Sequence, residues 1–481
     1  MKLLRHTLFN LIGLGAPLLV AVGSIPVLIH ELGPSRFGLL TLVWAVVSYF
    51  GLFDLGLGRA LTQQLAVVLS NKDFQKVGPL VGTATVLLAI LGVMAGLLMA
   101  SAASWGVGLI KDVPNQREAI DAVYAMALAM PFIILTSGFR GMLEAQHAFG
   151  IINLIRLPMG LFTFLGPLAV VFYGYGPRLD YIAWVLAAGR VIACVVHAFC
   201  AWRVLSKERS ELVWRTDLVK PLCISGGWLT VSNIVSPFMG YVDRFVIGAI
   251  VSASAVAYYT TPQELITKLW IVPGALTAVL FPAFAAQIAR RDDQTWVLFK
   301  KAVYWLFIVL LPVTVALTLF AHELLAIWIN PGFADYSAAL LKVFAVGILI
   351  NCLAHVPFTL IQSAGAARLT ALTHFIELPF FLVALWWLTS SYGVLGAAIA
   401  WLLRMVFDTS LMFILCCPLL GRPVKSLISL KVVMFALVTA AGFAGVLFQP
   451  LTIRVLWMFL LIGLLAVTLV TSSQSRGERC S

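Results

Sequence analysis

Residues 79–103 read PLVGTATVLLAILGVMAGLLMASAA, a run of 25 residues that contains no charged side chain. A helix of about 20 residues crosses the ~30 Å hydrocarbon core of a bilayer, so this run predicts one transmembrane helix. The rest of the chain has the same character, because 62% of its 481 residues are hydrophobic and only 11% are charged. A soluble protein of this length needs far more polar surface. We therefore expect an all-α polytopic membrane protein.

Further apolar runs of similar length indicate about fourteen transmembrane helices in all. Their approximate bounds are 8–30, 37–58, 119–139, 151–173, 181–203, 222–251, 255–288, 298–320, 337–361, 370–390, 393–418, 428–448 and 453–472. The first run follows Lys2 and Arg5, but it is long enough to span and leads directly into further runs. We therefore expect a first helix there and not a cleaved signal peptide.

The lysines and arginines are distributed unevenly among the loops. One alternate set of loops carries 22 of the 32 basic residues, the other set carries five, and five lie within the runs. The positive-inside rule places the richer set in the cytoplasm, so both termini are expected there, with the protein in a bacterial inner membrane. The net charge of +12 therefore reflects topology, and nucleic acid is not an expected partner.

A charged segment at 205–221 divides the chain into two similar halves. We expect an N-terminal six-helix lobe over 1–204 and a C-terminal six-helix lobe over 222–420, joined by this cytoplasmic linker. Residues 421–481 then add two helices and a cytoplasmic tail. Because each lobe has an even number of helices, a repeat of one lobe in the other is parallel, with its axis along the membrane normal.

Four short matches, in the same order in both halves, indicate such a duplication. They pair FGLLT from Phe37 with VAYYT from Val256, Leu157-Pro158 with Leu378-Pro379, Tyr173-Gly174 with Tyr392-Gly393, and Ala183-Trp184 with Ala400-Trp401. The shifts lie between 217 and 221 residues. The alternative is chance similarity among apolar segments.

Charged residues inside the runs are the candidates for a functional site, because an ionisable group at mid-bilayer costs about 2.5–3.5 kcal/mol and normally faces a cavity or a partner. Arg190 and Arg404 lie on the sixth and twelfth runs, which the repeat makes equivalent, and they share a face. These two cations predict a site between the lobes for an anionic substrate such as a diphosphate, since arginine binds phosphate oxygens in pairs. The alternative for Arg404 is a local pair with Asp408, four residues on.

Other charged residues within or near the runs complete the set of candidates. Arg244 and Lys268 are further candidate contacts to the substrate, and Asp54, Asp243, Glu264, Glu377 and Asp408 are candidates for ion coupling or gating. Several have a simpler alternative. Lys268 can pair with Glu264 on its own helix. Glu377 can contact His374, and Asp54 can help to terminate its helix.

Five segments of the chain, in order, carry a resemblance to a known family. They are ELGPSRFGLLTL (31–42), YFGLFDLGLGRALTQ (49–63), YVDRFVIGAIVSASAVAYYTTPQEL (241–265), QSAGAARLTAL (362–372) and YGVLGAAIAWLLR (392–404). Over about residues 1–420 the chain resembles the polysaccharide transporter family of the multidrug/oligosaccharidyl-lipid/polysaccharide superfamily, the Wzx-type flippases of O-antigen and exopolysaccharide synthesis.

The resemblance implies two six-helix lobes around a central cavity and the movement of undecaprenyl-diphosphate-linked oligosaccharides from the cytoplasmic to the periplasmic leaflet. It also implies membrane lipid, a polysaccharide polymerase and glycosyltransferases as partners. The two additional helices resemble those of the related lipid II flippases, which place arginines in the first helix. Here no basic residue follows Arg5 until Arg36, which disfavours lipid II as the substrate.

Two other classes of function compete with this interpretation. An ion-coupled multidrug antiporter of the same superfamily needs a cavity dominated by carboxylates, whereas here fixed cations prevail. A membrane-embedded glycosyltransferase or acyltransferase needs acid/base or metal-binding residues, commonly with a large extramembrane loop, and the sequence has neither HExxH nor such a loop. We expect a protein that is not an enzyme and that needs no cofactor or metal.

Overall fold

The computed structural model describes residues 2–50, 54–173, 176–206, 211–290, 294–427, 430–448 and 450–477. Within these ranges the regular structure consists of α-helices and short 3-10 turns, without a strand, which confirms the all-α fold. Parts of the predicted linker (207–210) and tail (478–481) lie outside the described residues. The chain divides into two compact units, Met1–Ala257 and Tyr258–Ser481.

The described helices agree with the predicted apolar runs. Nine of them are long and apolar enough to cross a membrane, and two shorter apolar helices lie near the C-terminus. Each predicted run falls largely on a helix, and two runs share a single helix in α1 (Lys2–Phe50) and again in α13 (Ala367–Leu419). The chain is therefore a multi-pass membrane protein, while the count of fourteen crossings stays a prediction.

A glycine bends each of these two long helices. Gly33 has φ 74° and Gly393 has φ 59°, in the left-handed region that side chains with a Cβ adopt only at a cost. At a shift of 219 residues Gly33 corresponds to Ser252, where α7 (Thr216–Ile250) gives way to α8 (Ala253–Thr267). The two corresponding positions thus hold a bend within one helix and a break between two helices, and both lie in the unit Met1–Ala257.

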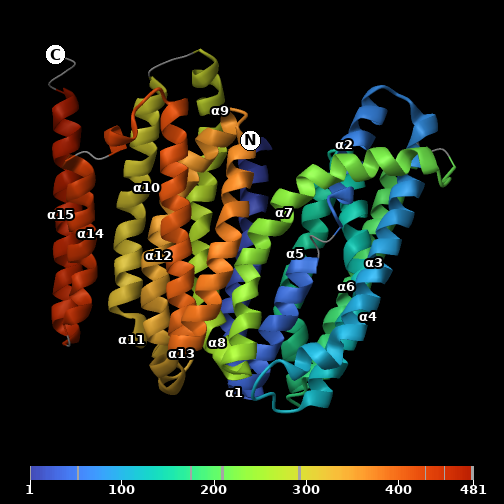
Figure 1. The fold of residues 1–481 in the computed structure, drawn as a ribbon, viewed down its shortest axis with the longest axis horizontal. Helices are drawn as coiled ribbons and strands as arrows, with labels where there is room; N and C mark the ends of the chain where they lie inside the picture. Colours follow the sequence, from blue (N-terminus) through green and yellow to red (C-terminus); the bar gives the residue numbers. More distant parts are fainter. Residues whose placement is uncertain are drawn as a thin grey trace. The chain divides into compact units, whose positions relative to one another are not determined.

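In the first unit, α4 (Gln116–Ala145) is the central helix and contacts five others. Its neighbours besides α1 are α2 (Leu57–Ser70), α3 (Val77–Gly108), α5 (Phe149–Phe172) and α6 (Leu179–Val204). Gly92 and Gly96 allow α3 to approach α4 closely, because a Cβ at either position would lie within 2.6 Å of the α4 backbone. Figure 1 shows α3, α4 and α6 running side by side.

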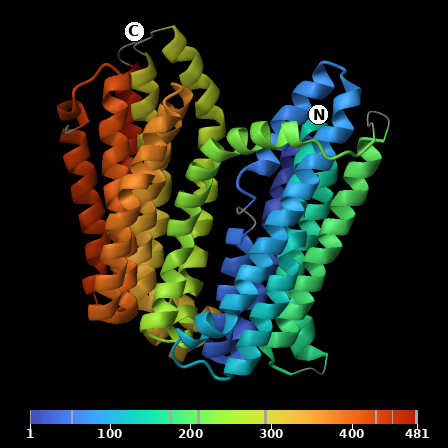
Figure 2. The same cartoon turned by 45° about the vertical axis from the view of Figure 1, so that its right-hand side comes forward.

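Helix α7 begins at Thr216, inside the predicted linker 205–221, and contacts α1, α2 and α3 of the first unit. Figures 1 and 2 show it changing direction along its length, with its first part crossing the ends of the other helices. The structural boundary at Ala257 lies after this helix. The predicted division at 205–221 into two lobes therefore stays a prediction.

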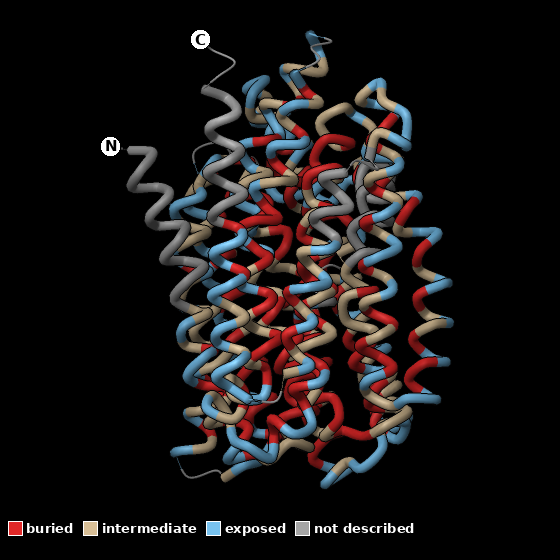
Figure 3. Tube along the Cα trace, turned by 90° about the vertical axis from the view of Figure 1, so that its left-hand side faces the viewer, coloured by how far each residue is buried: buried red, intermediate tan, exposed pale blue. Residues whose placement is uncertain are grey.

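In the second unit, α12 (Pro331–Ser363) is the central helix, and 61% of its most apolar segment is buried. It contacts α9 (Ile271–Ala289), α10 (Gln294–Leu319), α11 (Ala321–Trp328) and α13. The repeat makes α12 equivalent to α4, since Gln116 shifted by 219 falls on Asp335. The predicted additional helices are α14 (Leu430–Ala444) and α15 (Leu451–Gly477), which contact α10. In Figure 3 buried residues recur along one side of many helices, as expected where helices pack against one another on that side.

Candidate functional site

A polar cluster lies between the two halves of α13. His374 and Glu377 are three residues apart on the first half, and Arg404 and Asp408 are four apart on the second, so each pair shares one face of its helix. The bend at Gly393 turns the second half back against the first, because residues 27 apart in sequence meet there. The cluster therefore consists of four side chains from one bent helix.

The strongest contact in this cluster joins Arg404 to Glu377. The Nε of Arg404 donates a hydrogen bond to Oε1 of Glu377 at 2.9 Å, and their side chains are 11% and 2% exposed. The guanidinium also lies 5.3 Å from the ring centroid of Phe381. His374 Nε2 lies 3.7 Å from Asp408 Oδ1. Both contacts thus join one residue from each half of α13, Arg404 with Glu377 and His374 with Asp408.

The cluster keeps capacity for a further positive charge. Within the described residues, Glu377 Oε2 and Asp408 Oδ1 are buried atoms without a hydrogen-bond partner. One ligand-type atom from each of His374, Glu377 and Asp408 lies within 4.8 Å of the other two. A buried carboxylate oxygen is costly unless it is paired, so the arrangement can accept a proton or a small cation. The guanidinium of Arg404 already neutralises one carboxylate, which disfavours a resident divalent metal.

Arg190 lies in the first unit and has a different environment. It is half-buried near the middle of α6, and it makes no hydrogen bond or ion pair with any residue that the structure describes. The neighbouring Gly189 allows the ring of Phe162 to pack directly on the α6 backbone. A cation at this depth without a partner in the described protein is suited to meet an anion from outside the chain.

The other two predicted cations lie on α7 and at the end of α8. Arg244 is 5% exposed and lies 5.0 Å over the ring of Tyr241, while the adjacent Asp243 is fully buried and accepts a hydrogen bond from the Arg244 backbone at 2.8 Å. Lys268 pairs with Glu264 at 3.0 Å, with side chains 46% and 39% exposed. The observed contact of Lys268 is therefore the local pair with Glu264, which was the alternative to a contact with the substrate.

Asp54 acts on the helix that follows it. Its carboxylate accepts hydrogen bonds from the backbone N–H groups of Gly56 at 3.0 Å and Gly58 at 3.1 Å, in the first turn of α2. The hydroxyl of Ser137 on α4 donates a third bond at 2.9 Å. These contacts are those of a residue that caps the start of α2, whereas the alternative from the sequence was that Asp54 ends the preceding helix. A gating role for Asp54 stays a prediction.

Two ion pairs between residues far apart in the sequence were not predicted. Glu118 accepts hydrogen bonds from the Arg36 side chain at 3.0 Å and from the Leu179 backbone at 2.6 Å, which ties together α1, α4 and α6. Arg454 on α15 pairs with Glu323 on α11 and donates to the Leu319 carbonyl. The partners are 82 and 131 residues apart, and no local spacing signals such contacts.

Comparisons with known proteins agree with this architecture. The sequence profile of the family described as "Polysaccharide biosynthesis protein" matches residues 3–288. A curated Shigella flexneri protein named "Putative O-antigen transporter" is 30% identical over 413 residues, which cover 86% of this chain and 97% of that protein.

Solved structures show the same fold at low sequence identity. An inward-facing multidrug resistance MATE family transporter of the MOP superfamily matches with a TM-score of 0.71 and 14% identity, covering 87% of this chain and 99% of that one. The lipid II flippase MurJ in an inward closed conformation matches with a TM-score of 0.65 and 12% identity, covering 91% and 97%. The fold is therefore that of a membrane transporter.

Proposed function

Because this chain belongs to the polysaccharide biosynthesis protein family, we propose that it is a flippase for undecaprenyl-diphosphate-linked oligosaccharides. It would carry repeat units of O-antigen, capsule or exopolysaccharide across the bacterial inner membrane by alternating access. The identity to the Shigella protein over most of both chains supports this substrate class. The charge bias of the loops supports an orientation with both termini in the cytoplasm.

The observation that carries the proposal is Arg190. A half-buried arginine near the middle of a membrane-spanning helix, without a partner among the described residues, is a suitable contact for the diphosphate. Arg404 is the equivalent cation of the second unit, but it is already engaged by Glu377. We therefore assign the first contact with the diphosphate to Arg190. Arg404, which would exchange Glu377 for a phosphate oxygen, and Arg244 and Lys268 are the further candidate contacts.

The α13 cluster is the candidate for ion coupling. When Arg404 leaves Glu377 for the substrate, two buried carboxylates lose their cation and must take a proton or a sodium ion. Release of that ion would return Arg404 to Glu377 and expel the diphosphate. Asp243 and Glu264 remain further candidates for this role.

An ion-coupled multidrug antiporter is the second candidate, favoured by the carboxylates of the α13 cluster and by the fold shared with a MATE transporter. The two functions differ in the charge of the cargo. An antiporter of cationic drugs gains nothing from Arg190, whereas a diphosphate carrier depends on it. Drug resistance conferred by the protein, with glycan export unchanged on its deletion, would favour the antiporter.

The test is export of surface polysaccharide in a strain that depends on this protein. Arg190→Ala should reduce export at least about tenfold, because a charge-assisted hydrogen bond to an anion contributes about 1.5–3 kcal/mol. Arg190→Lys should retain part of the activity, since it keeps the charge but not the planar fork. Arg117→Ala removes an exposed arginine at the start of α4 and is the matched control. Intact export by the Arg190→Ala, Arg404→Ala double variant at normal expression would refute the proposal.

Partner proteins follow from the same pathway. A flippase of this class delivers its cargo to a polysaccharide polymerase, and glycosyltransferases on the cytoplasmic side supply it. Co-purification of either class of enzyme with the tagged protein would test these contacts.

A further inference from the structure

The loop between α3 and α4 is bonded to the junction between α7 and α8. The backbone N–H of Lys111 donates to the Gly248 carbonyl at 3.0 Å, and the Ala253 N–H donates to the Lys111 carbonyl at 3.0 Å. The ammonium of Lys111 donates to the Ile250 carbonyl at 2.7 Å. Backbone groups at helix ends lack partners within their own helix, so Lys111 supplies partners to the end of α7 and to the start of α8.

Helix α1 meets the same junction from a second side. A Cβ at Gly38 would clash with the Ala253 carbonyl oxygen and would lie 3.2 Å from the Ala257 backbone nitrogen, so this close approach depends on glycine. Ala253 and Ala257 are fully buried. The two contacts, of Lys111 and of Gly38 with residues 248–257, are called the closure below.

The helices that carry the closure on the α1 side are braced to one another. Glu118 of α4 accepts hydrogen bonds from the Arg36 side chain of α1 and from the Leu179 backbone at the start of α6. Arg36 is two residues from Gly38, and Glu118 is seven residues after Lys111. Gly38 and Lys111 therefore belong to one braced group of helices, and we expect them to move together.

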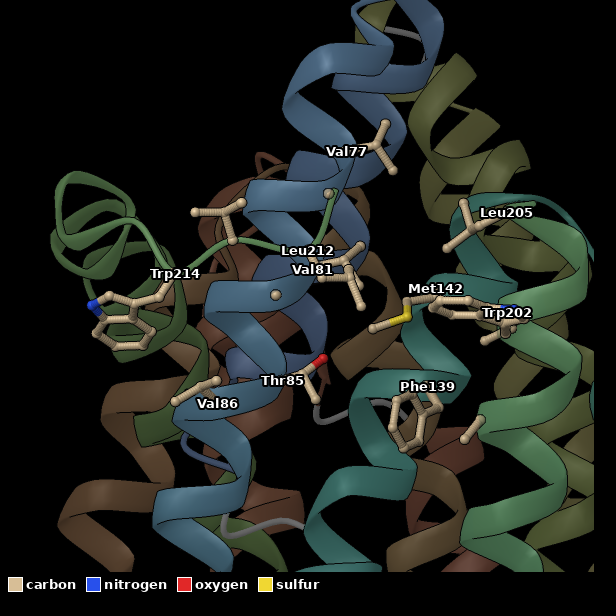
Figure 4. A pocket seen from close by; sticks show the side chains of 15 residues that line it. Val77, Val81, Thr85, Val86, Phe139, Met142, Trp202, Leu205, Leu212 and Trp214 are labelled. Carbon is tan, nitrogen blue, oxygen red and sulfur yellow. The ribbon is translucent and has the colours of Figure 1, made fainter. Parts of the chain in front are cut away.

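The segment before α7 is attached to the other end of α3. The backbone N–H of Arg215 donates to the Thr83 hydroxyl near the start of α3 at 3.0 Å, whereas Lys111 follows the end of that helix. This attachment borders an apolar cavity of about 400 Å³ between α3 and the ends of α4 and α6. Figure 4 shows Leu212 of this segment and Trp202 of α6 at the cavity. Both ends of α7 are thus tied to the helix pair α3 and α4.

Two prolines lie in α7 between these attachments. Pro221 and Pro237 each remove a backbone donor and allow a helix to bend, and Figures 1 and 2 show α7 changing direction along its length. The end of α7 can therefore move away from Lys111 while its start stays on α3. The predicted repeat assigns the α7–α8 junction to the second half of the chain and the α3–α4 loop to the first, so the closure joins the two halves.

We propose that the closure is the outer gate of the transporter, which opens when water replaces the bonds of Lys111 and α8 leaves Gly38. The proposal rests on alternating access in the proposed function, whose orientation places this end at the periplasm. Lys111 is exposed, so water can replace its hydrogen bonds at a small net cost. The ease of opening is therefore set by Lys111, and the closed geometry is set by Gly38.

The test measures how often the junction is uncovered. In the full-length protein with its seven cysteines replaced by alanine, Ala257→Cys provides a buried thiol beside Gly38. A membrane-impermeant maleimide added to right-side-out vesicles should label this thiol slowly. Lys111→Ala should raise the labelling rate about fivefold, since it removes the hydrogen bond of the ammonium to the α7 end. Gly38→Ala should raise the rate further, because its Cβ excludes the closed position.

Matched controls separate opening of the gate from unfolding. Arg117→Ala removes an exposed cation at the start of α4, and Gly23→Ala adds a methyl group where α1 has free space, so both should leave the rate unchanged. Ala122→Cys places the thiol on α4, where it is buried among α1, α2, α3, α5 and α6, and it should stay unlabelled in every variant. If Gly38→Ala exposes position 122 as well, it has unfolded the unit, and Lys111→Ala then decides alone.

Unchanged labelling of position 257 in Lys111→Ala and in folded Gly38→Ala overturns the proposal. A disulfide gives a second test, because a Cβ at Gly248 would lie 3.6 Å from the Ile110 side chain, within reach of a disulfide. Oxidised Ile110→Cys, Gly248→Cys protein should stop glycan export, and a reductant should restore it. Export that continues through the oxidised protein overturns the gate. Labelling needs no cargo, so a protein whose gate opens but which exports no glycan in its reduced form would contradict only the proposed function.

Discussion

Separating Arg404 from Glu377 should destabilise the second unit strongly, and the structure allows the size of the effect to be worked out. The pair is nearly enclosed, with 11% and 2% of the two side chains exposed. Removing one partner of such a pair leaves a buried charge and costs about 3–5 kcal/mol. Arg404→Met should cost about 3 kcal/mol, at the lower end of that range, because Glu377 can take a proton. Glu377→Met should cost about 3 kcal/mol as well.

The double variant is the sharper measurement. Two methionines in place of the pair leave no unpaired charge between them, so Arg404→Met with Glu377→Met should be close to neutral. The coupling energy is then about 6 kcal/mol, the two single losses together, far above the ~0.5 kcal/mol scatter of independent sites. The assay is reversible unfolding in mixed micelles with increasing sodium dodecyl sulfate, followed by circular dichroism. If the double variant loses the sum of the two single losses, the pair is not an energetic unit and the reasoning is wrong.

Three other predictions concern the Arg454–Glu323 pair and the bend at Gly393. Arg454→Ala should lower the free energy of unfolding by about 1–3 kcal/mol, since it removes a partly exposed ion pair with Glu323 and the hydrogen bond to the Leu319 carbonyl. Lys425→Ala, at an exposed position, is its control. Equal stability of the two variants would contradict the assignment. Burial raises the pKa of Glu323, but the hydrogen bond and charge of Arg454 outweigh it, so the folded pKa lies below the ordinary value. The stability from this pair is therefore present above the ordinary glutamate pKa of about 4.3 and is lost as the pH falls through the folded value, so wild type and Arg454→Ala should converge in acid unfolding curves. Gly393→Ala should cost about 1–2 kcal/mol because φ is 59° there, whereas Gly463→Ala, with free space around its Cβ, should be neutral or slightly stabilising in the same unfolding assay.

Hydrophobic runs predict the helices well because burial in lipid requires continuous apolar segments. The runs 370–390 and 393–418 were each expected as a helix, and both are present, although Gly393 joins them into one bent helix. The pattern of runs does not predict whether two neighbouring runs form one bent helix or two separate helices. A single glycine can bend a helix or end it, and the choice depends on packing around it.

The sequence predicts which residues belong to the candidate site, but not which of them contact one another. Arg404, Glu377 and Asp408 stand out as charges in apolar helices, which any reading of the sequence detects. Their pairing depends on the angle at which the two halves of α13 meet, so the contact between Arg404 and Glu377 follows no local spacing. Arg454 and Glu323 show the same limit, since neither lies in the middle of a run and their partnership exists only in the folded unit.

The bend at Gly33 has a counterpart in the break between α7 and α8, and the two junctions should differ in amide hydrogen exchange. In the break, the backbone of Ala253 donates to Lys111 and that of Lys111 donates to Gly248, so a loop from elsewhere in the unit protects it. At the bend, Gly33 has non-helical φ and ψ and Pro34 has no backbone N–H, so the helical hydrogen-bond ladder is interrupted there. We therefore expect the amides of Lys111 and Ala253, which are bonded across the break, to exchange more slowly than those next to Gly33.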